Sequence, residues 1–189
     1  TIANQLAHLE ACAAASDGDA LFEHLERGGY VLRIDPDVKP EMFHFAVISE
    51  GEIALLRQIT QVIRKGRVLA IERDALVLEQ GREALADNTL CINCTASAVE
   101  MRDSEPIFQP GKIVPQLVRA PLVTFSSAVC AYVEAHYDDD ATRNALCTPV
   151  PFPRNVGGYI QSTLVSLANQ MRWSQDKPLR NWMRESRLD

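Results

Sequence analysis

Several absences limit what this 189-residue chain can do. No apolar run approaches the ~20 residues that a membrane-spanning helix needs, and no charged start with a long apolar stretch marks a signal peptide. The 19 basic residues are scattered and are outnumbered by 25 acidic ones, for a net charge of −6. A nucleic-acid interface needs clustered Lys and Arg. We therefore expect a cytoplasmic protein with no nucleic-acid partner and no membrane partner.

The nine glycines include no G-x-G-x-x-G sequence. That fingerprint lets the backbone of a Rossmann domain hold a dinucleotide pyrophosphate at a helix start. The chain also begins with Thr1 and not with Met. We therefore expect the chain to be part of a longer protein, and we do not expect it to act as an enzyme by itself.

The cysteines are few and odd in number. Five cysteines indicate a reducing compartment, because a full set of disulfides is impossible. Cys91 and Cys94 have the spacing of a zinc or redox motif, but they lie in an apolar segment that resembles a strand, where positions three apart face opposite sides. No second motif and no nearby histidine accompanies them. We expect both cysteines to be buried structural residues, and we predict no metal site.

Helical periodicity and capping residues predict most of the helices. Asp17 precedes one apolar periodic segment, and Ser49 and Glu52 have the spacing of a capping box. An acidic run at residues 138–140 fits a helix cap, since it lacks the spaced ligands and glycine of a calcium loop. Helices are expected over residues 1–15, between the cap at 16–17 and the stop at 28–29, from 49, from 124, from the acidic run at 138–140, after 157–158, and from about 179.

Short aliphatic runs between polar turns predict the strands. Residues 67–72 and 75–79 flank the turn Arg73-Asp74 and form an expected hairpin, and residues 89–94 form an expected third, buried strand. Residues 30–34 and 113–118 are further strand candidates, the second bent by Pro115. The expected fold class is α/β, or α+β for an isolated fragment, with a helical C-terminal tail.

The order of these elements resembles that of flavoproteins with two dinucleotide-binding domains. In that family a β-meander of the form G-x-V-x-x-I…V-x-L-x-D-G precedes a strand that ends in A-T-G. Here the meander begins at Gly66 and the strand ends at Cys94-Thr95-Ala96-Ser97, without a match to the last glycine. The resemblance covers residues 66–136. Residues 32–35 (LRID), 146–151 (LCTPVP) and 170–173 (QxRW) resemble an uncharacterised, flavin-monooxygenase-like branch.

The resemblance implies a domain division and a function. Residues 1–48 would be the tail of the nicotinamide-binding domain. Residues 49–148 would hold the meander, closing strand and helix of the FAD-binding domain, and residues 149–189 a linker and terminal helices. The chain would be the C-terminal part of a flavin-dependent NAD(P)H oxidoreductase, with FAD and NAD(P)H as cofactors of the intact protein and a small-molecule substrate. The isolated chain is expected to bind FAD weakly or not at all.

Site residues follow from the same resemblance. Small residues at a strand end leave room for a ligand, Arg119 could contact a phosphate or ring oxygen, and a helix start favours negative charge. If strands 89–94 and 113–118 are parallel neighbours, their ends converge. An ordinary ion pair for Arg119 and a plain helix start for the serines are alternatives. The expected cofactor-binding residues are Thr95, Ala96, Ser97, Arg119, Thr124, Ser126 and Ser127.

A second interpretation is a non-enzymatic α+β domain that binds a protein through its terminal helices. Ile160, Leu164, Leu167 and Met171 form an apolar stripe. We expect this stripe to pack on the chain's own core or on a second copy in a homo-oligomer, and not on a membrane, because the helix is not rich in Lys and Arg. The chain as a whole could also contact the missing N-terminal portion of the protein. Two tryptophans in the last helices, at positions 173 and 182, are expected to be packing anchors.

Overall fold

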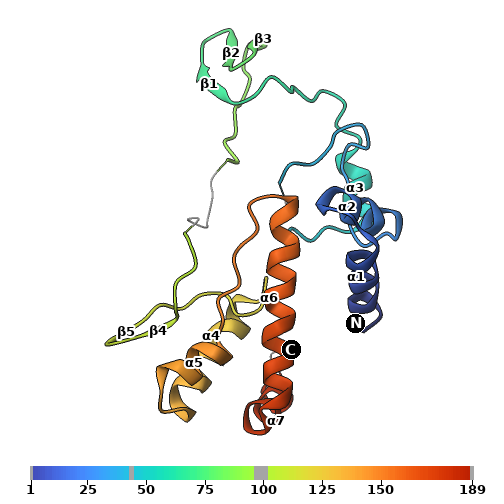
Figure 1. Cartoon of the computed structure of the whole chain (residues 1–189). Coiled ribbons are helices and arrows are strands. Elements are labelled where there is room, and N and C mark those ends of the chain that lie inside the picture. The colour runs from blue at the N-terminus through green and yellow to red at the C-terminus, as the bar shows by residue number, and fades with distance from the viewer. Residues whose placement is uncertain (1, 43–44, 96–101, 188–189) are drawn as a thin grey trace. The chain divides into compact units, whose positions relative to one another are not determined.

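The chain folds into seven helices and two small antiparallel sheets, as a computed structural model of residues 2–42, 45–95 and 102–187 describes it (Figure 1). This mixture is the α+β class that the sequence predicts. The chain divides into two compact units. We call residues 1–53 and 101–189 the helical unit, and residues 54–100 the meander unit. The predicted assignment of 1–48, 49–148 and 149–189 to parts of nucleotide-binding domains stays a prediction.

Local capping determines the starts of the early helices. Helix α1 spans Ile2–Ala14, α2 spans Gly18–Arg27 and α3 spans Glu50–Leu56. The Asp17 carboxylate accepts a hydrogen bond from the backbone N–H of Ala20 over 2.9 Å. At α3 the capping box is complete, since Glu52 N–H donates to Ser49 Oγ over 3.2 Å and Ser49 N–H donates to Glu52 Oε2 over 2.8 Å. Both predicted caps are confirmed.

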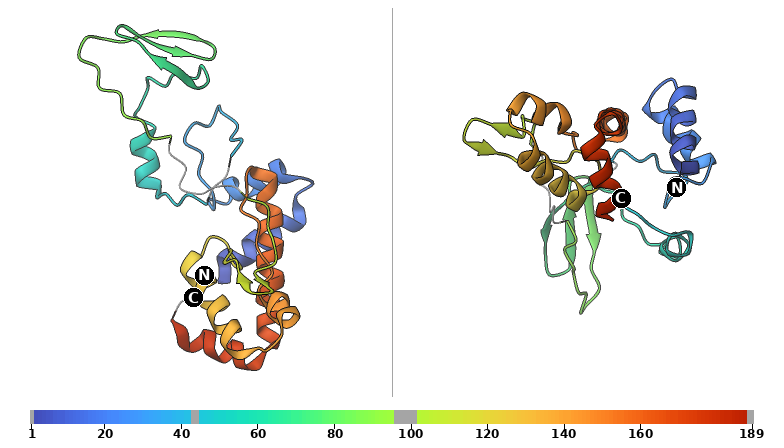
Figure 2. Two further views of the ribbon diagram at one scale, coloured as in Figure 1. Left: turned by 90° about the vertical axis from the view of Figure 1, so that its left-hand side faces the viewer. Right: turned by 90° about the horizontal axis from the view of Figure 1, so that it is seen from below.

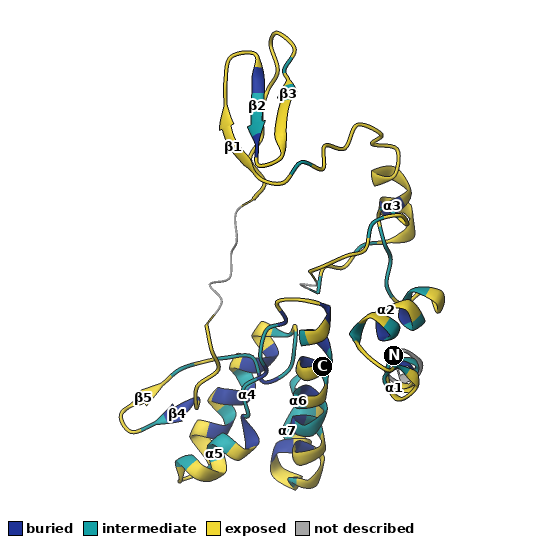
Figure 3. Ribbon diagram, turned by 45° about the horizontal axis from the view of Figure 1, so that its top comes forward, coloured by how far each residue is buried: buried dark blue, intermediate teal, exposed yellow. Residues whose placement is uncertain are grey.

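The meander unit contains the predicted hairpin and a third strand. Strands β1 (Val68–Ile71), β2 (Ala75–Leu78) and β3 (Gly81–Ala84) pair antiparallel in that order, with Ile71 opposite Leu76 and Leu78 opposite Gly81 (Figure 2). Strand β2 lies between the other two and contains the buried positions of the sheet (Figure 3). The third strand is thus residues 81–84, because a two-residue turn closes the next hairpin at the smallest loop-closure cost.

The prediction of a buried strand at residues 89–94 is wrong. These residues form no strand, Leu90 is 81% exposed and Ile92 is 75% exposed. Asn93 Oδ1 instead accepts hydrogen bonds from the N–H of Thr95 over 2.9 Å and from its hydroxyl over 2.7 Å. Such local side-chain bonds compete with a strand ladder. Cys91 and Cys94 are consequently exposed, contrary to the expected burial.

Two other predicted strands are absent or shortened. Residues 30–34 form no strand, because the chain turns back at the end of α2, where Tyr30 N–H donates to Leu25 O over 2.8 Å. Of residues 113–118 only the first is in a strand: β4 (Phe108–Gln109) pairs with β5 (Lys112–Ile113) in a short hairpin. Pro115 has no N–H and cannot extend the ladder.

The C-terminal half supplies the larger core. Helices α4 (Val123–His136), α5 (Asp140–Leu146), α6 (Val156–Gln175) and α7 (Lys177–Ser186) enclose it. Asp139 caps α5, so the acidic run is a helix cap as predicted. Trp173 is 2% exposed and Trp182 stacks on Tyr132, so both are packing anchors. The buried residues of this core are Ile107, Phe108, Val118, Phe125, Val129, Cys130, Val133, Leu146, Cys147, Trp173 and Leu179.

Helix α6 buries only part of the apolar stripe that the sequence predicts. Ile160 packs against the core of α1 and α2, as expected, but the rest of the inward face is polar. Leu164 and Met171 are 58% and 65% exposed, whereas Ser162, Ser166 and Asn169 are buried. The reason is the backbone that α6 packs against. Asn169 Nδ2 donates to Val118 O over 2.8 Å and to Thr148 O over 2.7 Å, in segments without regular structure whose carbonyls need partners. Satisfying those carbonyls decides which side of α6 faces inward.

Candidate functional site

Arg119 occupies a turn that the hydroxyl of Ser126 organises. Ser126, in the first turns of α4, is 2% exposed. Its oxygen accepts hydrogen bonds from the N–H of Val118 over 3.1 Å and of Arg119 over 3.3 Å, and its proton goes to Leu122 O over 2.7 Å. The turn continues into a cis peptide bond between Ala120 and Pro121. The Ser126 side chain is therefore engaged with the chain's own backbone.

The side chain of Arg119 lies between two hollows of the helical unit. It is half-buried, and its guanidinium carbon is 5.4 Å from the centroid of the Phe125 ring, in cation–π range. Arg119 and Gln170 line both hollows. The guanidinium of Arg119, which is charged at any physiological pH, therefore lies where the two hollows meet.

The larger hollow, which we call the aromatic pocket, has a volume of about 570 Å³. Its walls come from α1, from residues 29–32 and 45–48, from the Arg119–Pro121 turn and from α6. Tyr159 is near the ring of His8 (6.3 Å between centroids) and that of Phe45 (6.0 Å). Burial raises the pKa of Tyr159, so its phenol is neutral at physiological pH. The size and lining suit a small organic molecule.

The smaller hollow, which we call the arginine pocket, has a volume of about 380 Å³. Arg119 contributes from the turn before α4, and three further arginines come from α7 and the residue that follows it. Trp173 and Phe125 form apolar parts of the wall. Within the described part of the chain, no aspartate or glutamate lines this pocket. Its full lining is Arg119, Phe125, Gln170, Trp173, Ser174, Arg180, Met183, Arg184 and Arg187.

The seven predicted cofactor-binding residues fall into three groups. Arg119 and Ser126 lie together in the helical unit. Thr124 and Ser127 are exposed on α4, and Ser127 Oγ donates to Val123 O over 3.1 Å within the helix. Thr95 belongs to the meander unit, whereas Ala96 and Ser97 lie outside the described residues. The pair of parallel strands from which we inferred convergence does not form in the described residues, so a shared site stays a prediction without that support.

Two motifs of the resemblance contact each other as structural partners. Trp173 Nε1 donates to Leu146 O over 2.7 Å, and Arg172 donates to the Thr148 hydroxyl over 3.1 Å. The linker at 146–151 and the helix residues at 170–173 therefore support the fold. In the described ranges, no group of three or more His, Cys, Asp or Glu could hold a metal ion. Within those same ranges, no helix is long and apolar enough to cross a bilayer.

Sequence reasoning missed the residues that form the arginine pocket with Arg119. A signal was present, because Arg180, Arg184 and Arg187 recur at the spacing of one helix face. It was overlooked because the other charges of the chain are scattered and because the net charge is negative. The aromatic pocket had no comparable signal, since its walls come from five separate parts of the chain.

Comparison with known proteins finds mycobacterial relatives. The chain is 39% identical over 183 residues to an uncharacterised protein of Mycobacterium tuberculosis (strain ATCC 25618 / H37Rv), and equally to one of Mycobacterium bovis. These alignments cover 97% of the chain and 34% of each relative, so the chain spans about a third of their length. No family model matches the chain, and no solved structure matches it.

Proposed function

We propose that the chain is part of a flavin-dependent NAD(P)H oxidoreductase and helps to form the edge where flavin and substrate meet. The β-meander carries this proposal. The two glycines that the family pattern requires, Gly66 and Gly81, have φ of +76° and +130°, values that favour glycine. A Cβ at Gly66 would also displace the carboxylate of Glu79, which accepts a hydrogen bond from Arg67 N–H over 3.1 Å. The pattern and the backbone therefore agree at both positions.

The length of the relatives supports an incomplete catalytic unit. They are about three times as long as this chain, which leaves room for the dinucleotide fingerprints that its nine glycines do not contain. In the intact protein FAD would supply the redox chemistry, with NAD(P)H as hydride donor. The residues of this chain would bind and orient: the aromatic pocket would take an apolar ring, and Arg119 would contact an anionic group. The cytoplasmic setting is part of the same proposal and depends on the odd number of cysteines.

The test is the colour and redox behaviour of the full polypeptide that the gene encodes. We expect the purified protein to be yellow, to release FAD on denaturation, and to lose its visible flavin absorbance when NADH or NADPH is added under anaerobic conditions. The 189-residue chain, titrated with FAD in parallel, should show weak binding or none. A colourless full polypeptide that also fails to bind added FAD would contradict the proposal.

One observation favours the alternative, a domain that binds a protein. Leu164 and Met171 expose apolar surface on the outer face of α6, and Val68, Leu69 and Ile71 do so on β1. Exposed apolar surface of this kind needs a covering partner when it is contiguous. If the full polypeptide holds FAD and Leu164→Ser leaves the flavin content unchanged, the exposed α6 surface is not needed for cofactor binding. An FAD-free polypeptide would leave protein binding as the better account.

A further inference from the structure

We propose that the arginine pocket binds a phosphate or pyrophosphate group of a small-molecule ligand. This inference does not depend on the redox function proposed above. It depends on the convergence of four arginines on one hollow of about 380 Å³. The nature of the group follows from guanidinium chemistry, because its planar fork of N–H donors matches phosphate oxygens in pairs.

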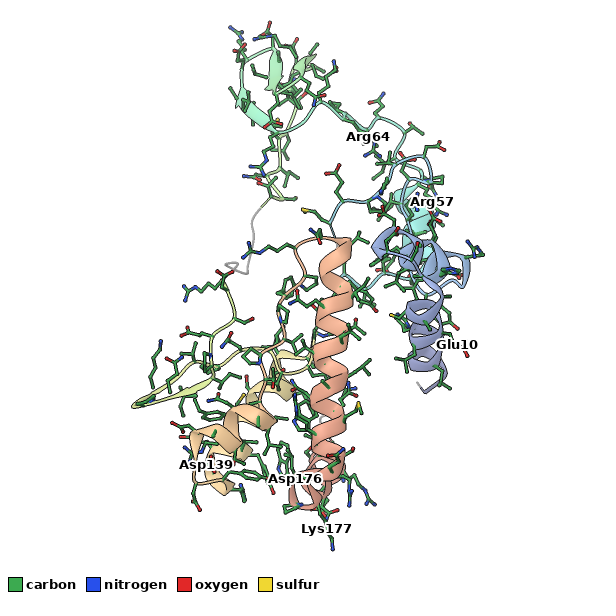
Figure 4. All side chains as sticks on the ribbon, viewed as in Figure 1. Glu10, Arg57, Arg64, Asp139, Asp176 and Lys177 are labelled. Carbon is green, nitrogen blue, oxygen red and sulfur yellow. The ribbon has the colours of Figure 1, made fainter. Side chains whose placement is uncertain are left out.

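The α6–α7 hairpin brings three of these arginines to the hollow. Asp176 ends α6 and caps α7, accepting a hydrogen bond from Leu179 N–H over 2.9 Å (Figure 4). Arg180 and Arg184 are one helical turn apart on α7, and Arg187 follows at its C-cap. Arg180 also donates to Ser174 O over 2.6 Å, which holds its guanidinium at the end of α6. The hairpin thus fixes the direction of this positive face.

The charge distribution is unusual for this chain. Its net charge is −6, yet the described lining of the pocket has four guanidinium groups and no carboxylate. Glu185 is on the same helix but does not line the pocket. Like charges gathered in this way repel one another, and a bound anion offsets that repulsion. A multiply charged group such as phosphate does so more effectively than a monoanion.

The wall of the pocket distinguishes it from a solvated helix face. The side chains of Arg180, Arg184 and Arg187 are exposed, as they would be on any charged surface helix. Behind them, however, lie Phe125 and Trp173, which are 3% and 2% exposed. An apolar wall lowers the local dielectric constant and strengthens attraction between the arginines and an anion. An anion here would therefore be held more tightly than on an open surface.

The neighbouring aromatic pocket indicates the rest of the ligand. The two hollows share Arg119 and Gln170, so a ligand whose phosphate lies among the arginines could extend an apolar or aromatic part past Arg119. Tyr159 and Phe45 would then contact that part. The ligand class is thus a phosphorylated organic molecule with an apolar body, and the phosphate alone is the part that the arginines recognise.

The experiment is calorimetric titration of the 189-residue chain with inorganic pyrophosphate at low ionic strength. We expect saturable binding at one site, weakening as salt is added. Arg184→Gln and Arg187→Gln should each lower the affinity by about tenfold, because each removes a charge-assisted hydrogen bond. Both side chains are exposed, so these variants should keep the fold, which circular dichroism would verify.

Arg154→Gln is the matched control. Arg154 is an exposed arginine of the same unit, paired only with the exposed Asp103 at 3.7 Å among the described contacts, and its replacement changes the net charge equally. The affinity of the Arg154→Gln variant for pyrophosphate should stay within about twofold of that of the parent chain, as expected for a distant, exposed charge. Absence of saturable binding by the parent chain, or an equal loss of affinity in Arg154→Gln, would overturn the proposal. Equal affinity for citrate would overturn the preference for phosphate.

Discussion

The buried side chain of Asn169 donates a hydrogen bond to the backbone carbonyl of Val118, 51 residues earlier, over 2.8 Å. The same amide nitrogen also donates to Thr148 O over 2.7 Å. One residue of α6 therefore joins the segment that contains Arg119 to the segment between α5 and α6. Arg119 and Gln170 line both pockets, so the geometry of the pockets depends on this polar contact.

Replacing Asn169 with Leu should destabilise the helical unit by about 2–4 kcal/mol, because one buried and one partly buried carbonyl would lose their donor. Chemical denaturation monitored by tryptophan fluorescence would measure this change, since Trp173 lies in the same core. Met171→Leu on the exposed side of α6 is the control and should change the free energy of unfolding little. If both variants unfold at the same denaturant concentration as the parent chain, Asn169 does not face inward.

Ser126→Ala should lower the free energy of unfolding by about 1–2 kcal/mol, since the N–H groups of Val118 and Arg119 would lose their acceptor. Ser127→Ala is the matched control on the same helix. The Ser127 hydroxyl is exposed and bonds only within the helix among the described contacts, so its loss should be close to neutral. Equal effects in denaturation midpoint would show that Ser126 does not organise the turn.

Gly66→Ala should destabilise the meander by about 1–3 kcal/mol, because the residue has positive φ and an added Cβ would displace the Glu79 carboxylate that accepts from Arg67 N–H. Gly51→Ala offers the opposite case, since Gly51 lies in α3, has no close neighbour at its Cβ position, and alanine favours a helix. Hydrogen exchange at the amides of residues 68–84 should therefore increase in Gly66→Ala and stay unchanged in Gly51→Ala, which lies in the other unit. Unchanged protection in Gly66→Ala would refute the turn geometry.

A thiol reagent should modify Cys91 and Cys94 rapidly in the folded chain, and Cys130 and Cys147 only after denaturant is added. The first pair is exposed and the second is buried. The neighbouring Cys130 thiol and burial also raise the pKa of Cys147, which lowers its thiolate fraction. Mass spectrometry of peptides from timed labelling would separate the sites. If Cys91 and Cys94 are protected in the native chain, they are buried, and the buried strand that the sequence predicts at residues 89–94 would be supported.

Elements that depend on neighbours in sequence could be predicted. The cap at Asp17, the capping box of Ser49 with Glu52, and the hairpin around residues 73–74 all use contacts within a few positions of the chain. Whether these caps and this hairpin form hardly depends on the rest of the molecule, so local sequence patterns were sufficient to predict them. The same holds for the helix that contains Ser126, whose place in the chain was predicted although the role of its hydroxyl was not.

Burial, in contrast, was decided by tertiary structure. The sequence by itself determined that α6 is a helix, but the carbonyls of Val118 and Thr148 determined that Asn169 faces inward and Leu164 outward. The apolar run at 89–94 could become a buried strand only with a neighbour to pair with, and among the described residues it pairs with none. The arginine pocket likewise required α7 to fold back on α6 beside Arg119, because four side chains become one site only when the backbone brings them together.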